Sequence, residues 1–230
     1  NKMSKTMDID FAIGVGDIPH KAKKKQYKAA TTSLKKLTVP FYPIMGNEEH
    51  NGTVEQYLHY ARKWNSKIEG PRYIKEYDKL AFVFASPDHG RDFDDTGAIW
   101  VSKQIERLHP KPVFLIVHGA PVGIYPEKPE KGIHNSVFKE KVMAQKNLAA
   151  VISGDLHMDM DRVEHSKKIN QTHFLHIPAL ERTKVPDKTR HTAMFRLMTI
   201  TDDGEVTVDT YAVGEDTPRG SHRYSFSIPQ

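Results

Sequence analysis

The chain of 230 residues contains no cysteine, which excludes disulfide bridges, thiolate metal sites and a cysteine nucleophile. It also lacks any apolar run near the ~18 residues that a membrane-spanning helix needs, so no membrane span is expected. No internal repeat or low-complexity segment divides the sequence. A single domain over residues 1–230 is therefore expected, since domains commonly reach ~250 residues.

No signal peptide is visible, and the chain begins at Asn1 rather than at Met. The cytoplasm is the default location, but a secreted protein whose signal peptide was cleaved upstream of Asn1 would have the same sequence. Nothing in the sequence indicates an oligomeric state.

Positive charge is in modest excess, with a formal net charge of +5. Much of the excess lies between Lys21 and Lys36. A solvated helix face is the simpler interpretation, and attraction for nucleic acid is the alternative that this small excess supports only weakly.

Short apolar runs alternate with segments of helical periodicity along most of the chain. Strands are expected at residues 11–15, 41–45, 73–77, 80–85, 112–117, 149–152, 174–177, 194–201 and 206–212, and helices at 21–37, 52–68, 98–108 and 136–146. Alternating strands and helices favour a mainly parallel sheet with helices outside it. The β-rich final third indicates a second, partly antiparallel sheet packed against the first. The fold class is therefore α/β.

Four polar motifs each follow an apolar strand. They are Gly16-Asp17, Gly46-Asn47-Glu48-Glu49-His50, His118-Gly119-Ala120-Pro121 and Gly154-Asp155-Leu156-His157. Strand ends of an open α/β sheet converge on one crevice, so side chains distant in sequence meet there. The candidate metal ligands are Asp17, Asn47, His118, Asp155 and His157. Their carboxylate, amide and imidazole groups suit Mn²⁺, Fe or Zn²⁺ better than Ca²⁺.

Each motif alone has a purely structural interpretation. Gly-Asp and Gly-Asn pairs are common turns, and a histidine at the end of a buried strand is more often hydrogen-bonded within the core than bound to a metal. Four such motifs in series, each after an apolar run, favour one shared site over four separate turns.

The series resembles the calcineurin-like metallophosphoesterases. Their motifs run Asp-x-His, Gly-Asp-x-x-Asp, Gly-Asn-His-(Asp/Glu), His followed by small residues or Pro, and Gly-His-x-His. The resemblance extends over residues 11–157. It implies a four-layer α/β/β/α sandwich of two mixed sheets and hydrolysis of phosphate esters by a dimetal-activated water. It also implies two divalent ions (Mn, Fe or Zn), with Asp17 contacting both, Asn47 and His118 on the second ion, and His157 on the first.

The chain departs from that pattern at four places. No Asp-x-His precedes Asp17, so the first strand that carries it in the family is expected to lie upstream of the given residues. His20 stands where the family has an acid three residues after Asp17. Glu48 replaces the histidine after Asn47, so Glu48 and the nearby His50 are the candidate catalytic residues. Asp155 replaces the first histidine of Gly-His-x-His and can still bind a divalent metal.

Two main functions remain open from the sequence. One is a metal-dependent hydrolase of phosphomonoesters or phosphodiesters, with Arg91, His89 or His134 as further contacts to the substrate phosphate. The other is a catalytically impaired binding module that keeps the fold. An Asp-x-His upstream of Asn1 would favour the enzyme.

Overall fold

The centre of the protein is a six-stranded mixed sheet in the order β3-β4-β5-β6-β8-β7. The computed structural model describes residues 3–189 and 192–229. The strands of this sheet are β3 (Arg72–Glu76), β4 (Ala81–Ala85), β5 (Val113–Ile116), β6 (Leu148–Ser153), β7 (Ser166–Ile169) and β8 (Thr172–His176). Strands β4, β5, β6 and β8 are parallel, and β3 and β7 run antiparallel at the two edges. The parallel strands therefore end at a common edge.

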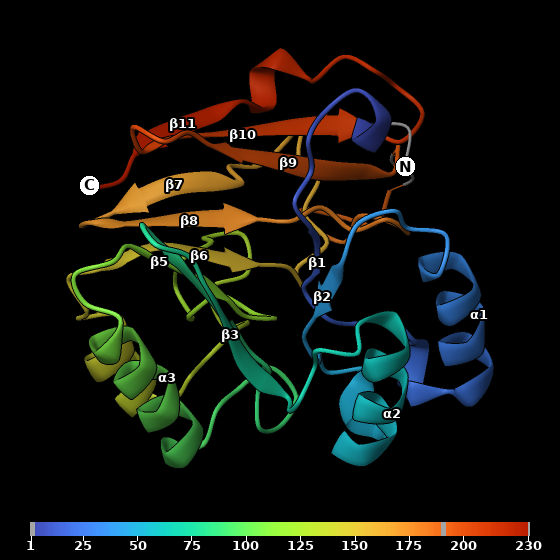
Figure 1. Ribbon diagram of the computed structural model, residues 1–230, viewed down its shortest axis with the longest axis horizontal. Helices are drawn as coiled ribbons and strands as arrows, with labels where there is room; N and C mark the ends of the chain where they lie inside the picture. The colour runs from blue at the N-terminus through green and yellow to red at the C-terminus, as the bar shows by residue number, and fades with distance from the viewer. Residues whose placement is uncertain (1–2, 190–191, 230) are drawn as a thin grey trace.

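Two smaller sheets make up the neighbouring layer. Strand β1 (Ala12–Gly14) pairs in parallel with β2 (Phe41–Pro43). Strands β9 (Met194–Ile200), β10 (Glu205–Ala212) and β11 (Tyr224–Ser227) form an antiparallel sheet with β10 in the middle. In Figure 1 this antiparallel sheet lies along the top of the molecule, against β7 and β8.

Helices cover the outer sides of these layers. Helix α3 (Asp95–Arg107) packs with the π-helical turn η4 (Phe138–Val142) on one side, whereas α1 (Lys24–Leu34) and α2 (Val54–Trp64) lie beside β1 and β2 (Figure 1). The other short turns are η1 (Met3–Lys5), η2 (His20–Ala22), η3 (Glu49–Asn51) and η5 (Gly220–His222). Across the described part of the chain, no helix combines the length and apolar character needed to cross a bilayer.

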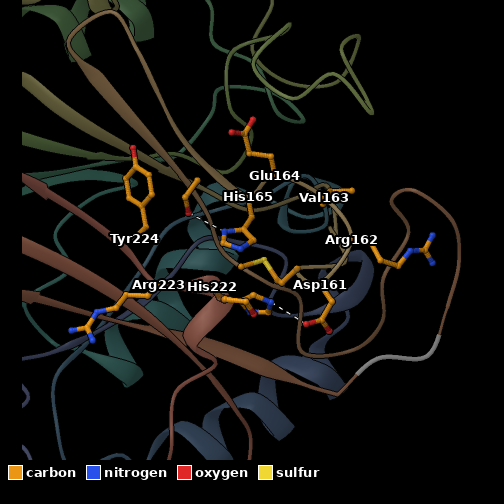
Figure 2. A pocket seen from close by; sticks show the side chains of 11 residues that line it. Asp161, Arg162, Val163, Glu164, His165, His222, Arg223 and Tyr224 are labelled. Carbon is orange, nitrogen blue, oxygen red and sulfur yellow. Dashed lines mark hydrogen bonds and ion pairs between the residues drawn. The ribbon is translucent and has the colours of Figure 1, made fainter.

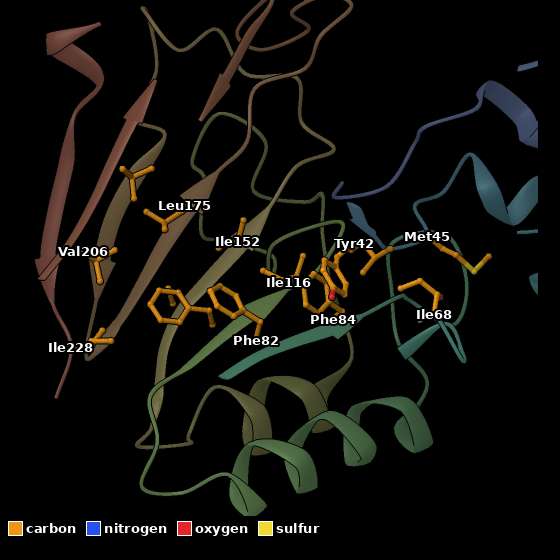
Figure 3. Close-up of a cluster of buried hydrophobic side chains, with 14 of the residues drawn as sticks. Tyr42, Met45, Ile68, Phe82, Phe84, Ile116, Ile152, Leu175, Val206 and Ile228 are labelled. Carbon is orange, nitrogen blue, oxygen red and sulfur yellow. The ribbon is translucent and has the colours of Figure 1, made fainter. Parts of the chain in front are cut away.

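Alternation along the buried strands creates two apolar layers. In β4, Phe82 and Phe84 face the smaller sheets and pack in one cluster with Val208 of β10. Val83, between them, faces the opposite way and packs in a second cluster with Val101 of α3. Figure 3 shows the first cluster between the sheets. Because each fully buried side chain of this kind contributes about 1.5–3 kcal/mol, both faces of the central sheet have to be covered.

The predicted α/β class with two packed sheet layers is confirmed, and the second layer is divided into separate two- and three-stranded sheets. The helix predicted at 21–37 begins only at Lys24, because Lys21 and Ala22 have left-handed φ angles of 51° and 48°. The helix predicted at 136–146 is the five-residue turn η4. Strands β7 and β11 were not predicted, since neither contains an apolar run.

Candidate metal centre

Four loops at the ends of β1, β2, β5 and β6 bring oxygen and nitrogen donors together. The ligand atoms of Asp17, His118 and Asp155 all lie within 4.8 Å of one another. His118 Nε2 lies 3.4 Å from Asp17 Oδ1, 3.5 Å from Asp155 Oδ1 and 3.2 Å from Asn47 Oδ1. Three of the five predicted ligands, Asp17, Asn47 and Asp155, therefore surround the Nε2 atom of a fourth, His118.

Glycines allow these loops to approach each other. A Cβ on Gly16 would lie 2.7 Å from His118 Nδ1, and a Cβ on Gly46 would lie 2.6 Å from His118 Cε1. The backbone beside the ligands is also unusual, because Asp17 and Asp155 have φ angles of 57° and 67°. Non-glycine residues in this left-handed region cost about 1 kcal/mol or more each, and such strain concentrates at functional sites.

The orientation of the His118 ring is set by its other nitrogen. Nδ1 lies 2.7 Å from the Val15 carbonyl, which can only accept, so Nδ1 donates and Nε2 faces the carboxylates. Burial by itself lowers the pKa of His118, but the hydrogen bond to Asp155 and the charge of Asp17 raise it to about 9. The carboxylates thus favour a positive charge at Nε2. A backbone carbonyl on one imidazole nitrogen, with the other facing acidic groups, is a common arrangement for a metal-binding histidine.

Asp155 is held on both sides. Arg91 Nε donates to Asp155 Oδ2 at 2.5 Å, while Oδ1 faces His118. Burial raises the pKa of Asp155, but His118 and Arg91 more than offset this and hold that pKa well below its usual range. Arg91, a candidate contact for the substrate phosphate, is thus bonded to a candidate ligand. His134, the similar candidate after β5, has its Nε2 2.9 Å from the Glu130 carbonyl.

Glu49 is a buried residue of the site that was not predicted. Its side chain is 0% exposed. One oxygen accepts from the backbone N–H groups of Asp17 (2.9 Å) and Gly46 (2.8 Å), and the other from that of Ile18 (2.8 Å). Burial, followed by the charge of Asp17, raises the pKa of Glu49 to about 7. Glu49 therefore ties the β1 and β2 loops together, and the acid that ends the family's Gly-Asn-His-(Asp/Glu) motif was the signal for it.

The two candidate catalytic residues occupy different surroundings. The Glu48 backbone N–H donates to Asp17 Oδ1 at 2.9 Å, and the Glu48 carboxylate turns toward His20. His50 is half-buried and has its Nε2 3.1 Å from the Pro87 carbonyl, and burial lowers its pKa. Glu48 thus borders the cluster, whereas one ring nitrogen of His50 is bonded to the backbone.

His157 lies within electrostatic range of Asp17 and Asp155. Its Nδ1 lies 3.0 Å from the Arg182 carbonyl and therefore donates. Its Nε2 lies 3.2 Å from Lys184 Nζ, which donates to it. The tautomer suits metal binding through Nε2. In this arrangement, however, an ammonium group faces the nitrogen that a metal would take.

The donor set fits one divalent ion better than two. Asp17, Asn47, His118 and Asp155 offer a carboxylate–amide–imidazole set around one point. For a second ion, His157 could join Asp17 only after parting from Lys184. Within residues 3–189 and 192–229, the cluster of Asp17, His118 and Asp155 is the only group of three or more such acidic or histidine donors.

A cavity of about 380 Å³ lies apart from this cluster, between residues 160–166 and 221–224. Figure 2 shows His165 and His222 at its centre, with His222 paired to Asp161 at 3.0 Å and His165 bonded to Ser166 at 2.9 Å. None of the predicted ligands lines it. The position of the donor atoms, rather than the size of this cavity, therefore identifies the candidate site.

The chain was compared with known protein families and solved structures. No protein-family model matches the chain. A solved dimetal phosphatase from Danio rerio superposes on 99% of this chain and 87% of its own, with a TM-score of 0.73 and 10% sequence identity. The chain therefore has the fold of that dimetal phosphatase. The expected α/β fold with two packed sheet layers is confirmed by this likeness.

Two other known proteins are similar to this chain. A probable glycerophosphodiester phosphodiesterase from Arcobacter nitrofigilis is 25% identical over 118 residues, which are 50% of this chain. The match covers 43% of that relative, so the chain corresponds to less than half of its length. A predicted phosphoesterase from Streptococcus pneumoniae covers 98% of this chain and 86% of its own at 10% identity, with a TM-score of 0.47.

Proposed function

We propose that this chain is a metal-dependent phosphoesterase that hydrolyses phosphomonoesters or phosphodiesters. The observation that carries the proposal is the convergence of Asp17, Asn47, His118 and Asp155 from four loops onto one point. The names of two similar proteins, a dimetal phosphatase and a probable glycerophosphodiester phosphodiesterase, agree with this chemistry.

These four residues would hold a divalent cation, with Mn²⁺, Fe or Zn²⁺ suited to the mixed donors. When bound, such an ion acidifies a coordinated water and offsets the negative charge of phosphoryl oxygens. If two ions bind, as the family resemblance implies, Asp17 would contact both. His157 would then bind the first ion through Nε2, in place of its hydrogen bond with Lys184.

The remaining residues of the site hold this ligand set in place. Glu49 fixes the backbones that carry Asp17 and Asn47 through three N–H groups. The Val15 carbonyl holds the His118 ring, and Arg91 holds one oxygen of Asp155. Ligands that are oriented by such partners need little rearrangement when the cation binds, which favours affinity.

The test is hydrolysis of p-nitrophenyl phosphate and bis(p-nitrophenyl) phosphate with and without Mn²⁺. We expect turnover that EDTA abolishes and added Mn²⁺ restores. Asp17→Asn removes a carboxylate from the donor set and should lower kcat/KM by about 100-fold or more. The matched control is Asp78→Asn in the exposed β3–β4 turn, which should retain activity.

The alternative is a module that binds the metal and ligand without turnover. If the unaltered chain binds Mn²⁺ but hydrolyses neither ester, the enzymatic proposal is wrong and this alternative stands.

A further inference from the structure

A histidine and a carboxylate face each other across the β1 and β2 loops. His20 Nδ1 lies 3.0 Å from Glu48 Oε2. The family pattern has an acid at the position of His20 and a histidine at the position of Glu48. Taken singly, one substitution removes an acid and the other removes a histidine. Taken together, they keep one imidazole and one carboxylate, but the imidazole now lies on the β1 loop and the carboxylate on the β2 loop.

We propose that His20 is the proton donor to the leaving group and that Glu48 orients it. This inference rests on the proposed phosphoesterase function and deepens it. In the reaction, the oxygen of the attacking water forms a bond to phosphorus as the bond to the leaving oxygen breaks. The leaving oxygen keeps that electron pair and takes the proton from His20 Nε2. The water releases a proton to solvent, and His20 regains one from solvent.

Glu48 is fixed in a position that suits this role. Its backbone N–H donates to Asp17 Oδ1 at 2.9 Å, which places the residue directly beside the candidate metal ligands. Its Oε2 also accepts from the Lys21 backbone N–H at 2.7 Å. The charge of Glu48 also acts on Arg91, the partner of Asp155. The carboxylate is therefore anchored at the edge of the cluster.

His20 keeps a nitrogen available for the substrate. Its Nδ1 is directed at Glu48, so Nδ1 donates and the ring orientation is set by a carboxylate. The side chain is 54% exposed, against 24% for Glu48. The imidazole that faces Glu48 through Nδ1 can therefore be reached from solvent. A histidine oriented by a carboxylate is a common arrangement for acid–base catalysis.

The two residues expected from the sequence are less suited to donate. Glu48 Oε2 already accepts from His20 and from the Lys21 N–H, so it acts as an acceptor. His50 is half-buried, and its Nε2 is bonded to the Pro87 carbonyl. The simplest competing explanation for the His20–Glu48 pair is a surface ion pair, which contributes only about 0–1 kcal/mol and has no role in the reaction.

Leaving-group dependence separates these explanations. Phenolate is a poorer leaving group than p-nitrophenolate and depends more on protonation. We expect His20→Ala to lower kcat/KM for phenyl phosphate by about 100-fold or more, and for p-nitrophenyl phosphate by less than about tenfold. Glu48→Ala should also lower kcat/KM more for phenyl phosphate than for p-nitrophenyl phosphate, but by less than His20→Ala does. Glu48→Gln keeps an acceptor oxygen and should lower kcat/KM least of the three variants.

Two further measurements complete the experiment. Mn²⁺ affinity, followed by calorimetry, should be unchanged in His20→Ala because His20 contributes no ligand. The control His59→Ala removes an exposed histidine of α2 and should leave both esters unaffected. If His20→Ala lowers kcat/KM equally for the two esters, or for neither, the proposed role of His20 is wrong while the proposed phosphoesterase function still stands. No Mn²⁺-dependent turnover by the unaltered chain would overturn both this inference and the proposed function.

Discussion

At the residue scale, the site depends on the absence of a side chain at position 46. A methyl group there would lie 2.6 Å from His118 Cε1 and would collide with Asp17 Oδ1. Both neighbours are candidate ligands, and His118 is fixed by burial and by the Val15 carbonyl. Neither can move without leaving the arrangement that favours a cation.

We therefore expect Gly46→Ala to weaken Mn²⁺ binding by at least about tenfold and to cost about 1–3 kcal/mol of stability, because a methyl group is forced into a filled site. Calorimetric Mn²⁺ titration and urea unfolding measure the two effects. Gly220→Ala is the control, since a Cβ there meets nothing within 4 Å. Unchanged Mn²⁺ affinity in Gly46→Ala would contradict the geometry of the cluster.

The candidate ligands were predictable one by one because each follows an apolar strand. Asp17, Asn47, His118 and Asp155 needed only the rule that parallel strand ends converge. Their partners gave no comparable signal. Arg91 meets Asp155 across 64 sequence positions, and Lys184 meets His157 across 27. Nothing in the local pattern of residues specifies pairs of this kind.

At the element scale, helix α2 positions the second ligand loop. It begins at Val54, a few residues after Asn47, and Tyr57 donates from it to the Pro43 carbonyl at the end of β2 at 2.9 Å. Thr53 caps the helix by accepting from the Gln56 N–H at 3.1 Å. The cap satisfies one of the N–H groups left open at the first turn.

Thr53→Ala should lower the free energy of unfolding by about 1 kcal/mol, the usual cost of losing such a cap. Thr53→Ser keeps the hydroxyl and should lie close to the unaltered chain. Urea unfolding followed by circular dichroism gives both values. If the alanine and serine variants were equally stable, the capping bond would contribute nothing in solution.

Short edge strands were the elements that sequence patterns missed. Strand β7 (Ser166–Ile169) and strand β11 (Tyr224–Ser227) have only four residues each, lie at the edges of their sheets and are partly exposed. Each is a strand because it pairs with a neighbour, β8 or β10. Hydrogen bonding to another strand, rather than local preference, decides such short segments.

At the scale of the whole molecule, three buried histidines link stability to pH. Burial is the main cause for each and lowers the pKa to about 3 for His165, about 3 for His176 and about 4 for His173. The charge of Arg196 adds to the effect at His165 and His176, and that of Lys168 at His173. Below about pH 6.5 the unfolded chain takes up protons that the folded chain does not.

The stability from these histidines is therefore complete above about pH 6.5 and is lost as the pH falls toward 4. Each of the three histidines should lower the free energy of unfolding by roughly 2 kcal/mol between pH 7 and pH 5. Glu49 and His118, whose pKa values are raised, act in the opposite direction. A single variant is therefore needed to isolate one contribution.

His173→Phe removes one of these groups and should reduce the loss of stability between pH 7 and pH 5 by roughly 2 kcal/mol. Urea unfolding at both pH values, in EDTA, measures this loss. The same substitution at exposed His59 is the control and should leave the loss unchanged. An identical loss in the His173 variant and the unaltered chain would show that His173 is not buried neutral.

The sequence by itself determined the α/β class, the two sheet layers and the convergence of Asp17, Asn47, His118 and Asp155. These follow from periodicity and from residues directly after strands, which are local properties. Only the tertiary structure decided that Glu49 joins two loops, that Arg91 and Lys184 face candidate ligands, and that His20 meets Glu48. The physical reason is that such contacts depend on how close separate loops come once both faces of the central sheet are packed.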